Sequence, residues 1–389
     1  MKVLIINRYM GVYGGAETVI KELGCHLNKL GVVNRILTLN ISQEVRKICG
    51  SLDIVTPKEE FSYEFRSGGF WSSLAIIREI KALRQLAKKH AGEFDVINAH
   101  NFPASWVCGG LDKPVAWMCN EVPDFYNNPK PSLAVRLLRS AGIARDRCVV
   151  NRDIGNICVA DEYNARKVIQ RYKRVPVIIN YGIDYDFFSR SEDREEAVKK
   201  YNLGNFFVLL QVGMLSPEKN QLKSIQALEA LRWDIPNIRL ILAGRPQSPY
   251  DGILRKYIKE EGLEEYIVFT GHITRAQVRG LYQACAIALF PVKSQGGWLA
   301  PFEALCAGRP IVTSTTMGAA SIIKKEALGI VTDDFISGIR DIALNFKMYR
   351  GKAEQARQWV RQNLSWPLFA KKMLRVFEDT STAIQKKEP

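Results

Sequence analysis

The segment Pro291–Pro310 reads PVKSQGGWLAPFEALCAGRP and shows the strand–loop–helix pattern from which the fold can be inferred. The apolar run Ile287–Pro291 predicts a buried strand. A helix is expected to begin near Pro301, because proline is favoured in the first helical position. The free N–H groups of that helix would then point to the carboxyl edge of a parallel sheet, where open α/β sheets bind ligands. Glu303, in the expected first turn, either complements the helix dipole or accepts hydrogen bonds from the hydroxyls of a ribose.

Outward from this segment, short apolar strands alternate with amphipathic helices along the chain. Most of these strands are apolar on both faces, which is typical of parallel strands covered by helices. The series breaks at the turn-rich stretch Asn180–Asp184 and then begins again. We therefore predict an α/β protein with two doubly wound, Rossmann-like domains, residues 1–185 and 186–365. The last stretch, residues 366–389, is predicted to form an amphipathic helix.

The predicted elements can be stated by their ranges. The strands are Lys2–Asn7, Arg35–Leu39, Asp95–Ala99, Pro114–Met118, Asn156–Ala160 and Val175–Ile179 in the first domain, and Phe206–Val212, Arg239–Ala243, Ile267–Thr270, Ile287–Pro291 and Pro310–Thr313 in the second. The main helices of the first domain are expected near residues 16–30, 72–90 and 161–172, and a charged helix is expected over Glu192–Tyr201.

The composition is that of a soluble globular protein, with 47% hydrophobic and 24% charged residues in 389. No apolar run approaches the ~18–20 residues that span a bilayer. Asn7 and Arg8 end the first apolar stretch too early for a signal peptide, so we expect a cytoplasmic protein. Its eight cysteines are then reduced and buried as small apolar side chains. The four histidines do not have the spacing of metal ligands, so no metal site is expected.

The net charge of +15 is unevenly distributed. Residues 130–174 contain 11 basic and 4 acidic side chains. Such a patch could face nucleic acid, an anionic membrane or a phosphate-bearing substrate. It lacks the interleaved aromatic residues of nucleic-acid stacking platforms, so we expect no nucleic-acid partner.

Two more strand–helix junctions contain residues suited to a phosphate ligand. In Gly11–Glu17, glycines would let the backbone approach a ligand closely, although the pattern is not the G-x-G-x-x-G of dinucleotide-binding proteins. The alternative is a tight turn with an acidic residue in the first helical turn. In Val212–Asn220, Lys219 is placed where a helix opens, and it is either a diphosphate ligand or a solvated surface lysine.

Five segments occur in the order, and at the strand–helix junctions, that one enzyme family shows. They are Gly14–Glu17 (G-G-x-E), Val177–Phe188 (ending N-G-V-D-x-x-x-F), Gly213–Lys219 (G-R-L-x-x-x-K), Gln295–Glu303 (E-x7-E) and Ala307–Pro310 (A-x-G-x-P). By these motifs the chain resembles a family 4 glycosyltransferase of the E-x7-E type, and the similarity extends over nearly its full length.

This resemblance implies the GT-B fold, with two facing Rossmann-like domains, an active site in the central cleft, and a last helix that crosses back to the first domain. It also implies retaining transfer of a hexosyl or N-acetylhexosaminyl group from a UDP- or GDP-sugar, without a metal ion or other cofactor. The acceptor would be a glycan or a lipid-linked glycan in polysaccharide or glycolipid biosynthesis.

The resemblance also implies roles for individual residues. Lys219 would neutralise the departing diphosphate, and Glu303 would hold the ribose hydroxyls. The expected catalytic residues are Asn120, Lys219, Gln295 and Glu303. The expected donor-binding residues are Gly14, Gly15, Gly213, Arg245, His272, Ile273, Gly296, Gly297, Leu299 and Ala300.

Three positions depart from the family pattern. Met214 replaces an arginine, Gln295 replaces the first glutamate of E-x7-E, and Asn120 replaces a histidine. His100 is a weaker alternative for that histidine and is expected to be structural. Amides still hydrogen-bond sugar hydroxyls, so we expect an active enzyme. The alternative is a degenerate family member that binds nucleotide or glycan without catalysis.

The first domain is also expected to contact an anionic membrane, on the cytoplasmic face, to reach a lipid-linked acceptor. The segment Phe70–Lys89 places apolar residues on one helical face and basic residues elsewhere, as interfacial helices do. The alternative is an amphipathic helix that covers its own sheet. The apolar residues concerned are Leu74, Ile77, Ile80 and Leu83, and the basic ones are Arg78, Lys81, Arg84, Lys88 and Lys89.

Overall fold

The computed structural model describes residues 1–11, 14–61, 70–123, 132–293 and 297–385. The chain divides into two compact units. The first unit comprises Met1–Tyr181 together with Trp366–Pro389, and the second comprises Gly182–Ser365. Each unit is an α/β domain built on one parallel sheet, which confirms the predicted fold class.

The sheet of the first unit has the strand order β3-β2-β1-β4-β5-β6-β7, and its strands are parallel. The strands are β1 (Lys2–Ile6), β2 (Val33–Leu37), β3 (Ile54–Val55), β4 (Val96–His100), β5 (Val115–Met118), β6 (Asn156–Val159) and β7 (Val177–Ile178). The helices are α1 (Gly15–Lys29), α2 (Gln43–Cys49), α3 (Phe70–Ala91), α4 (Asn101–Val107), α5 (Leu133–Asp153), α6 (Glu162–Tyr172) and α16 (Trp366–Gln385).

Helices cover the first sheet because successive side chains of its strands point to opposite faces and both sets are apolar. On β1, Leu4 and Ile6 join a core that includes Leu83 of α3 and Val168 of α6. The last helix, α16, packs against this unit. Its Thr380 accepts a hydrogen bond from the side chain of Asn156 at 2.8 Å.

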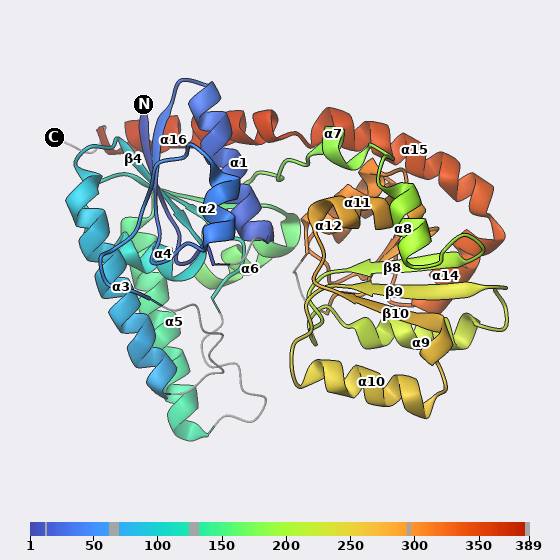
Figure 1. The fold of residues 1–389 in the computed structure, drawn as a ribbon. Helices are drawn as coiled ribbons and strands as arrows, with labels where there is room; N and C mark the ends of the chain where they lie inside the picture. Colours follow the sequence, from blue (N-terminus) through green and yellow to red (C-terminus); the bar gives the residue numbers. More distant parts are fainter. Residues whose placement is uncertain (12–13, 62–69, 124–131, 294–296, 386–389) are drawn as a thin grey trace. The chain divides into compact units, whose positions relative to one another are not determined.

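The second sheet has the order β10-β9-β8-β11-β12-β13, again with parallel strands. Helices α9 and α10 lie on one side of this sheet and α11 and α12 on the other (Figure 1). The strands are β8 (Phe207–Val212), β9 (Ile238–Ala243), β10 (Ile267–Gly271), β11 (Ile287–Phe290), β12 (Ile311–Thr313) and β13 (Ile330–Val331). The helices are α7 (Tyr185–Phe188), α8 (Arg194–Lys200), α9 (Gln221–Leu231), α10 (Tyr250–Glu260), the 3-10 helix η1 (Glu264–Tyr266), α11 (Arg275–Ala284), α12 (Leu299–Cys306), α13 (Ala320–Lys325), α14 (Phe335–Leu344) and α15 (Phe346–Asn363).

The chain passes from the first unit to the second after Tyr181, four residues before the boundary that we predicted at residue 185. The physical reason is that residues 182–185 bond to the second unit. The N–H of Ile183 donates to the carbonyl of Leu364 at 3.1 Å, and Asp184 pairs with Arg275.

Candidate active site

The second sheet reverses its strand order between β8 and β11, and ligands of open α/β sheets bind at such switch points. Because the two strands are parallel neighbours, the segments that follow them leave the sheet at the same edge. The turn after β8 contains Lys219, and the loop after β11 contains Gly297 and leads into α12. The fold therefore brings two of the predicted motifs to one place.

Lys219 and Gly297 lie close together at this edge. Gly297 has a φ of +87°, and a Cβ added to it would lie 2.8 Å from Nζ of Lys219. A side chain here would displace the ammonium group, so glycine is required by space as well as by backbone conformation. Gly297 comes two residues before α12, so the lysine charge lies near the residues that open this helix. A cation beside a helix N-terminus favours an anion such as a diphosphate.

The turn that carries Lys219 is held by hydrogen bonds to its backbone. Gln211 donates from Nε2 to the carbonyl of Lys219 at 2.7 Å, and the hydroxyl of Ser224 donates to Oε1 of Gln211 at 2.8 Å. The N–H of Lys293 donates to the carbonyl of Glu218 at 2.8 Å, which joins the two loops. The backbone position of the lysine is thus set before any ligand binds.

Gly213 lets the loops after β8 and β9 approach each other. Its φ is +143°, and a Cβ on Gly244 would lie 2.0 Å from the Gly213 carbonyl oxygen. Only two glycines permit this contact. Arg245 follows directly, with its carbonyl accepting from Leu215 at 2.9 Å and its side chain exposed.

Helix α12 begins at Leu299, two residues before the predicted start at Pro301. Proline fits the third helical position as well as the first, because the first four N–H groups have no partner within a helix. Glu303 is therefore the fifth residue of α12, and the prediction that it lies in the first turn is wrong. Burial raises the pKa of Glu303 to about 7. Ala300, which does lie in the first turn, accepts a hydrogen bond from the hydroxyl of Tyr282 at 3.2 Å.

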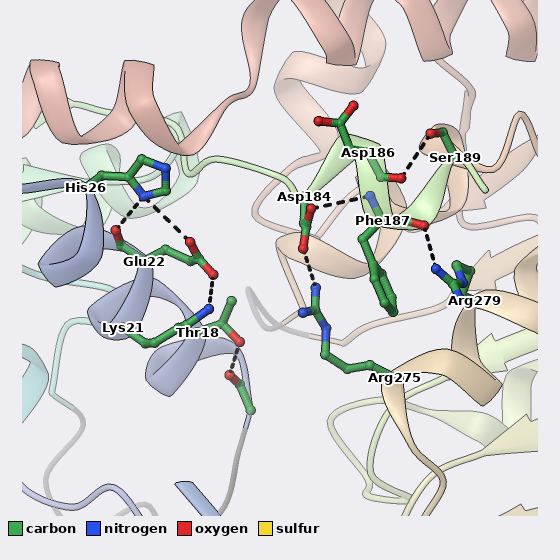
Figure 2. Close-up of polar contacts among 11 residues, drawn as sticks. Thr18, Lys21, Glu22, His26, Asp184, Asp186, Phe187, Ser189, Arg275 and Arg279 are labelled. Carbon is green, nitrogen blue, oxygen red and sulfur yellow. Dashed lines mark hydrogen bonds and ion pairs between the residues drawn. The ribbon is translucent and has the colours of Figure 1, made fainter. Parts of the chain in front are cut away.

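Arg275 is a charged neighbour of Glu303 that sequence reasoning did not identify. Burial has the largest effect on the pKa of Glu303. The positive charge of Arg275 has the second largest effect and lowers this pKa, whereas the negative charge of Asp184 raises it. Arg275 donates from Nη2 to Asp184 at 3.4 Å (Figure 2). Its guanidinium carbon lies 4.6 Å from the centre of the Phe187 ring. The available signal was its position two residues after Ile273, one of the predicted donor-binding residues.

The other predicted donor-binding residues of this unit lie at the same sheet edge. His272 is exposed and Ile273 is half-buried, and both follow β10. Leu299 is half-buried at the start of α12. Gln295 and Gly296 lie outside the described residues.

In the first unit, the predicted glycine turn opens α1. Gly14 is the N-cap residue and Gly15 the first helical residue. The hydroxyl of Thr18 donates to the carbonyl of Gly14 at 2.7 Å (Figure 2). Burial raises the pKa of Glu17, which lies in the first turn of the helix.

Asn120 comes two residues after β5, at the carboxyl edge of the first sheet. It is half-buried, and its Oδ1 accepts a hydrogen bond from the hydroxyl of Tyr181. His100 is instead fully buried at the end of β4, with Nε2 2.7 Å from Oδ1 of Asn98. Burial lowers the pKa of His100 to about 3, so it stays neutral and inside the fold.

Two family models match most of the chain. Residues 13–187 match the model described as Glycosyltransferase Family 4, and residues 193–366 match the model described as Glycosyl transferases group 1. The chain belongs to the family 4 glycosyltransferases. The two matched ranges lie one after the other along the chain, separated by residues 188–192.

Several similar proteins are mannosyltransferases by name. The GDP-mannose-dependent alpha-(1-6)-phosphatidylinositol monomannoside mannosyltransferase of Mycobacterium tuberculosis is 24% identical over 205 residues, which are 49% of this chain and 53% of the relative. The alpha-1,3/1,6-mannosyltransferase ALG2 of Rhizomucor pusillus is 25% identical over 258 residues, 57% of this chain and 56% of the relative. The chain thus spans about half the length of the curated relatives it matches.

Solved structures of glycosyltransferases share the fold of this family 4 chain. Anabaena HepE in complex with UDP and glucose matches with a TM-score of 0.78 and 18% identity, over 97% of this chain and 99% of HepE. WaaG, a glycosyltransferase involved in lipopolysaccharide biosynthesis, matches with a TM-score of 0.74 and 18% identity, over 96% of this chain and 99% of WaaG. These similarities establish two Rossmann-like domains of the GT-B fold.

Proposed function

We propose that this chain is a retaining glycosyltransferase that moves a sugar from a UDP- or GDP-sugar to a glycan or lipid-linked glycan. The observation that carries the proposal is the lysine–glycine arrangement at the switch point of the second sheet, where the ammonium of Lys219 lies beside Gly297 before α12. The family membership of the chain and the named activities of its relatives support the class of reaction.

The chemistry requires stabilisation of a leaving group. The bond between the sugar C1 and the diphosphate oxygen breaks, and its electron pair goes to that oxygen. The ammonium of Lys219 and the start of α12 stabilise this negative charge. Electrostatic stabilisation of this kind is usually the largest single contribution to catalysis. The carboxylate of Glu303 holds the ribose hydroxyls of the nucleotide.

The acceptor hydroxyl attacks C1 from the face that the diphosphate leaves, so the configuration is retained. The proton of that hydroxyl passes to the departing phosphate oxygen, and no side-chain base or metal ion takes part. Asn120 and Gln295 then position the donor sugar by hydrogen bonds.

The test is to incubate the full chain with a panel of UDP- and GDP-sugars and to measure released nucleoside diphosphate. We expect release from one donor type well above that from a Lys219→Ala variant. Binding of a nucleoside diphosphate without release from any donor would instead support the degenerate alternative.

We also propose that the first unit contacts an anionic membrane, and the supporting surface is the exposed part of α5. Leu133, Leu137 and Leu138 are 72%, 64% and 52% exposed, although leucine is normally buried. Helix α5 also carries exposed arginines, Arg136 and Arg145 among them. Exposed apolar side chains among cations suit the interface of an anionic bilayer.

The predicted apolar face of α3 contributes less to this surface. Ile80 and Leu83 are buried in the core of the first unit, whereas Ile77 is 59% exposed. The side chain of Leu74 lies outside the described residues. Among described residues, no helix has the length and apolar character needed to cross a bilayer.

Co-sedimentation with vesicles tests this contact. The native chain is expected to pellet with phosphatidylglycerol-containing vesicles and not with phosphatidylcholine alone, at moderate salt. Replacing Leu133, Leu137 and Leu138 by serine is expected to abolish pelleting. Leu344→Ser is the matched control, because Leu344 is 79% exposed in the second unit. Equal pelleting by the triple variant and the native chain would exclude α5 as the contact.

A further inference from the structure

The side chain of Tyr181 connects the predicted sugar-contacting amide to a rigid aromatic cluster. Tyr181 is only 6% exposed and follows β7 by three residues. Its ring meets Phe369 of α16 edge-on, with the ring centres 5.7 Å apart, and Phe369 meets Trp366 in the same way at 5.8 Å. The Tyr181 hydroxyl donates a hydrogen bond to Oδ1 of Asn120.

In the structure, this hydrogen bond holds the Asn120 amide with its acceptor end against the Tyr181 hydroxyl. An asparagine amide has an acceptor end and a donor end, which exchange places when the group turns over. With Oδ1 bound to the Tyr181 hydroxyl, Nδ2 lies on the opposite side of the amide. Burial raises the pKa of Tyr181 well above its ordinary value, so the hydroxyl keeps the proton that it donates to Oδ1.

The cluster also lies where the chain leaves and re-enters the first unit. Tyr181 is the last residue before the chain enters the second unit, and Trp366 is the first residue after it returns. Phe369 contacts both rings. The Tyr181 hydroxyl is therefore held by packing that involves both chain crossings, and it has little freedom to follow a moving amide.

We propose that Tyr181 is a positioning residue of the donor site, which orients the Asn120 amide so that its N–H₂ group donates to an oxygen of the donor sugar. This inference rests on the proposed function, in which Asn120 contacts that sugar. The Tyr181 hydroxyl does not itself touch the substrate. By orienting the Asn120 amide, it determines that this amide donates to an acceptor oxygen of the sugar. Loss of the hydroxyl frees the amide to turn over and present its carbonyl oxygen instead.

The experiment compares the full-length native chain with Tyr181→Phe, Asn120→Ala and the double variant. With the best donor, Tyr181→Phe is expected to lower kcat about three- to tenfold, the effect of one neutral hydrogen bond. In the Asn120→Ala background, the same change is expected to have no further effect on kcat, because no amide remains to be oriented.

Tyr172→Phe is the matched control for loss of a buried tyrosine hydroxyl. The Tyr172 hydroxyl donates to Asp146 at 2.6 Å within the first unit. This control is expected to lower the thermal midpoint at least as much as Tyr181→Phe while kcat stays within about twofold of the native value.

The possible outcomes distinguish a failure of the Tyr181 inference from a failure of the proposed function. Absence of turnover by the native chain would remove the proposed function, and the inference with it. Native turnover with an unchanged kcat in Tyr181→Phe would overturn the inference alone. An equal loss of kcat in both backgrounds would also overturn it, because the hydroxyl would then act through the fold and not through Asn120.

Discussion

At the residue scale, the proposed site relies on a single lysine where the family pattern provides two cations. The family arginine that follows Gly213 is Met214 here, and its side chain is 40% exposed. Lys219 is therefore the one cation of the motif G-R-L-x-x-x-K in this chain. The fixed turn around it and the space provided by Gly297 both serve to place its charge.

Lys219→Ala is accordingly expected to lower kcat about 100-fold or more, as loss of a fixed charge-stabilising group does in other enzymes. Asn120→Ala and Gln295→Ala are expected to lower kcat only about tenfold, because each removes hydrogen bonds to the sugar. Lys256→Ala is the control, since Lys256 is a surface lysine of the same unit, 75% exposed. A Lys219→Ala variant as active as Lys256→Ala would contradict the assigned role.

Glu303, the proposed ribose ligand, has a buried carboxyl group that affects the stability of the fold. Its pKa is about 7 in the folded chain, against an ordinary value of 4.5. Between pH 4.5 and 7 the folded state holds a proton that the unfolded state has lost, so stability decreases as pH rises through this window. Above pH 7 the full cost of the buried charge is present.

Glu303→Gln is therefore expected to raise the thermal midpoint at pH 8, with a difference that vanishes towards pH 4.5. The same variant is expected to bind nucleoside diphosphate more weakly, because an amide accepts fewer hydrogen bonds from ribose hydroxyls than a carboxylate. Identical midpoints at pH 8 for the variant and the native chain would show that the carboxyl group is not destabilising.

The sequence predicted which residues come to the sheet edge but not all of their neighbours. Lys219 and Gly297 could be placed because each follows a recognisable strand. Arg275 could not be paired with Asp184, because 91 residues separate them and no local pattern encodes a tertiary ion pair. The start of α12 was misplaced because proline is tolerated at several positions of a first turn.

At the element scale, arginines of the second unit donate to carbonyls at or just beyond the C-terminal ends of three helices. Arg309 donates from Nη1 to Cys285 at the end of α11 at 3.1 Å. Arg350 donates to Gly308, just beyond α12, at 2.7 Å, and Arg357 donates to Ser189 at the end of α7 at 3.4 Å. Cations at helix C-termini complement the negative end of the dipole.

Arg309→Met is expected to lower the free energy of unfolding by about 1–3 kcal/mol, because carbonyls that Arg309 satisfies would lose their donor. Chemical denaturation measures this change. Arg340→Met is the control, since Arg340 makes a half-exposed ion pair with Asp234 and is expected to contribute about 0–1 kcal/mol. Equal effects of the two changes would show that the capping arrangement adds nothing.

Several elements that sequence reasoning missed lack a clear periodicity of apolar residues. Strands β3 and β13 have two residues each, which is too short to show alternation. Helix α5 was read only as a basic stretch, because leucines such as Leu133 and Leu137 face outward and do not mark a buried face. Long apolar strands such as β8 could be predicted, because both of their faces are covered.

At the scale of the whole molecule, both sheets contain the strand order 3-2-1-4-5-6, counted along each unit, and the first sheet continues with a seventh strand. The fold class could be predicted because parallel strands buried on both faces leave continuous apolar runs. The crossing of α16 back to the first unit came only from the family resemblance, since an amphipathic helix does not specify the sheet on which it packs.

Nucleotide binding should be measurable on the whole chain as a shift in thermal midpoint, because a ligand that binds the folded state stabilises it. We expect UDP or GDP to raise the midpoint more than the corresponding nucleoside, and Lys219→Ala to reduce that difference. If the variant retains the full difference, the diphosphate does not bind at Lys219.

The most direct test of the central claim is proton NMR of the native reaction, run with its best nucleotide sugar and acceptor in excess EDTA. The account predicts a glycoside whose anomeric configuration is the same as that of the sugar in the donor, formed without added metal. A product of inverted configuration, or no product from any UDP- or GDP-sugar, would contradict it.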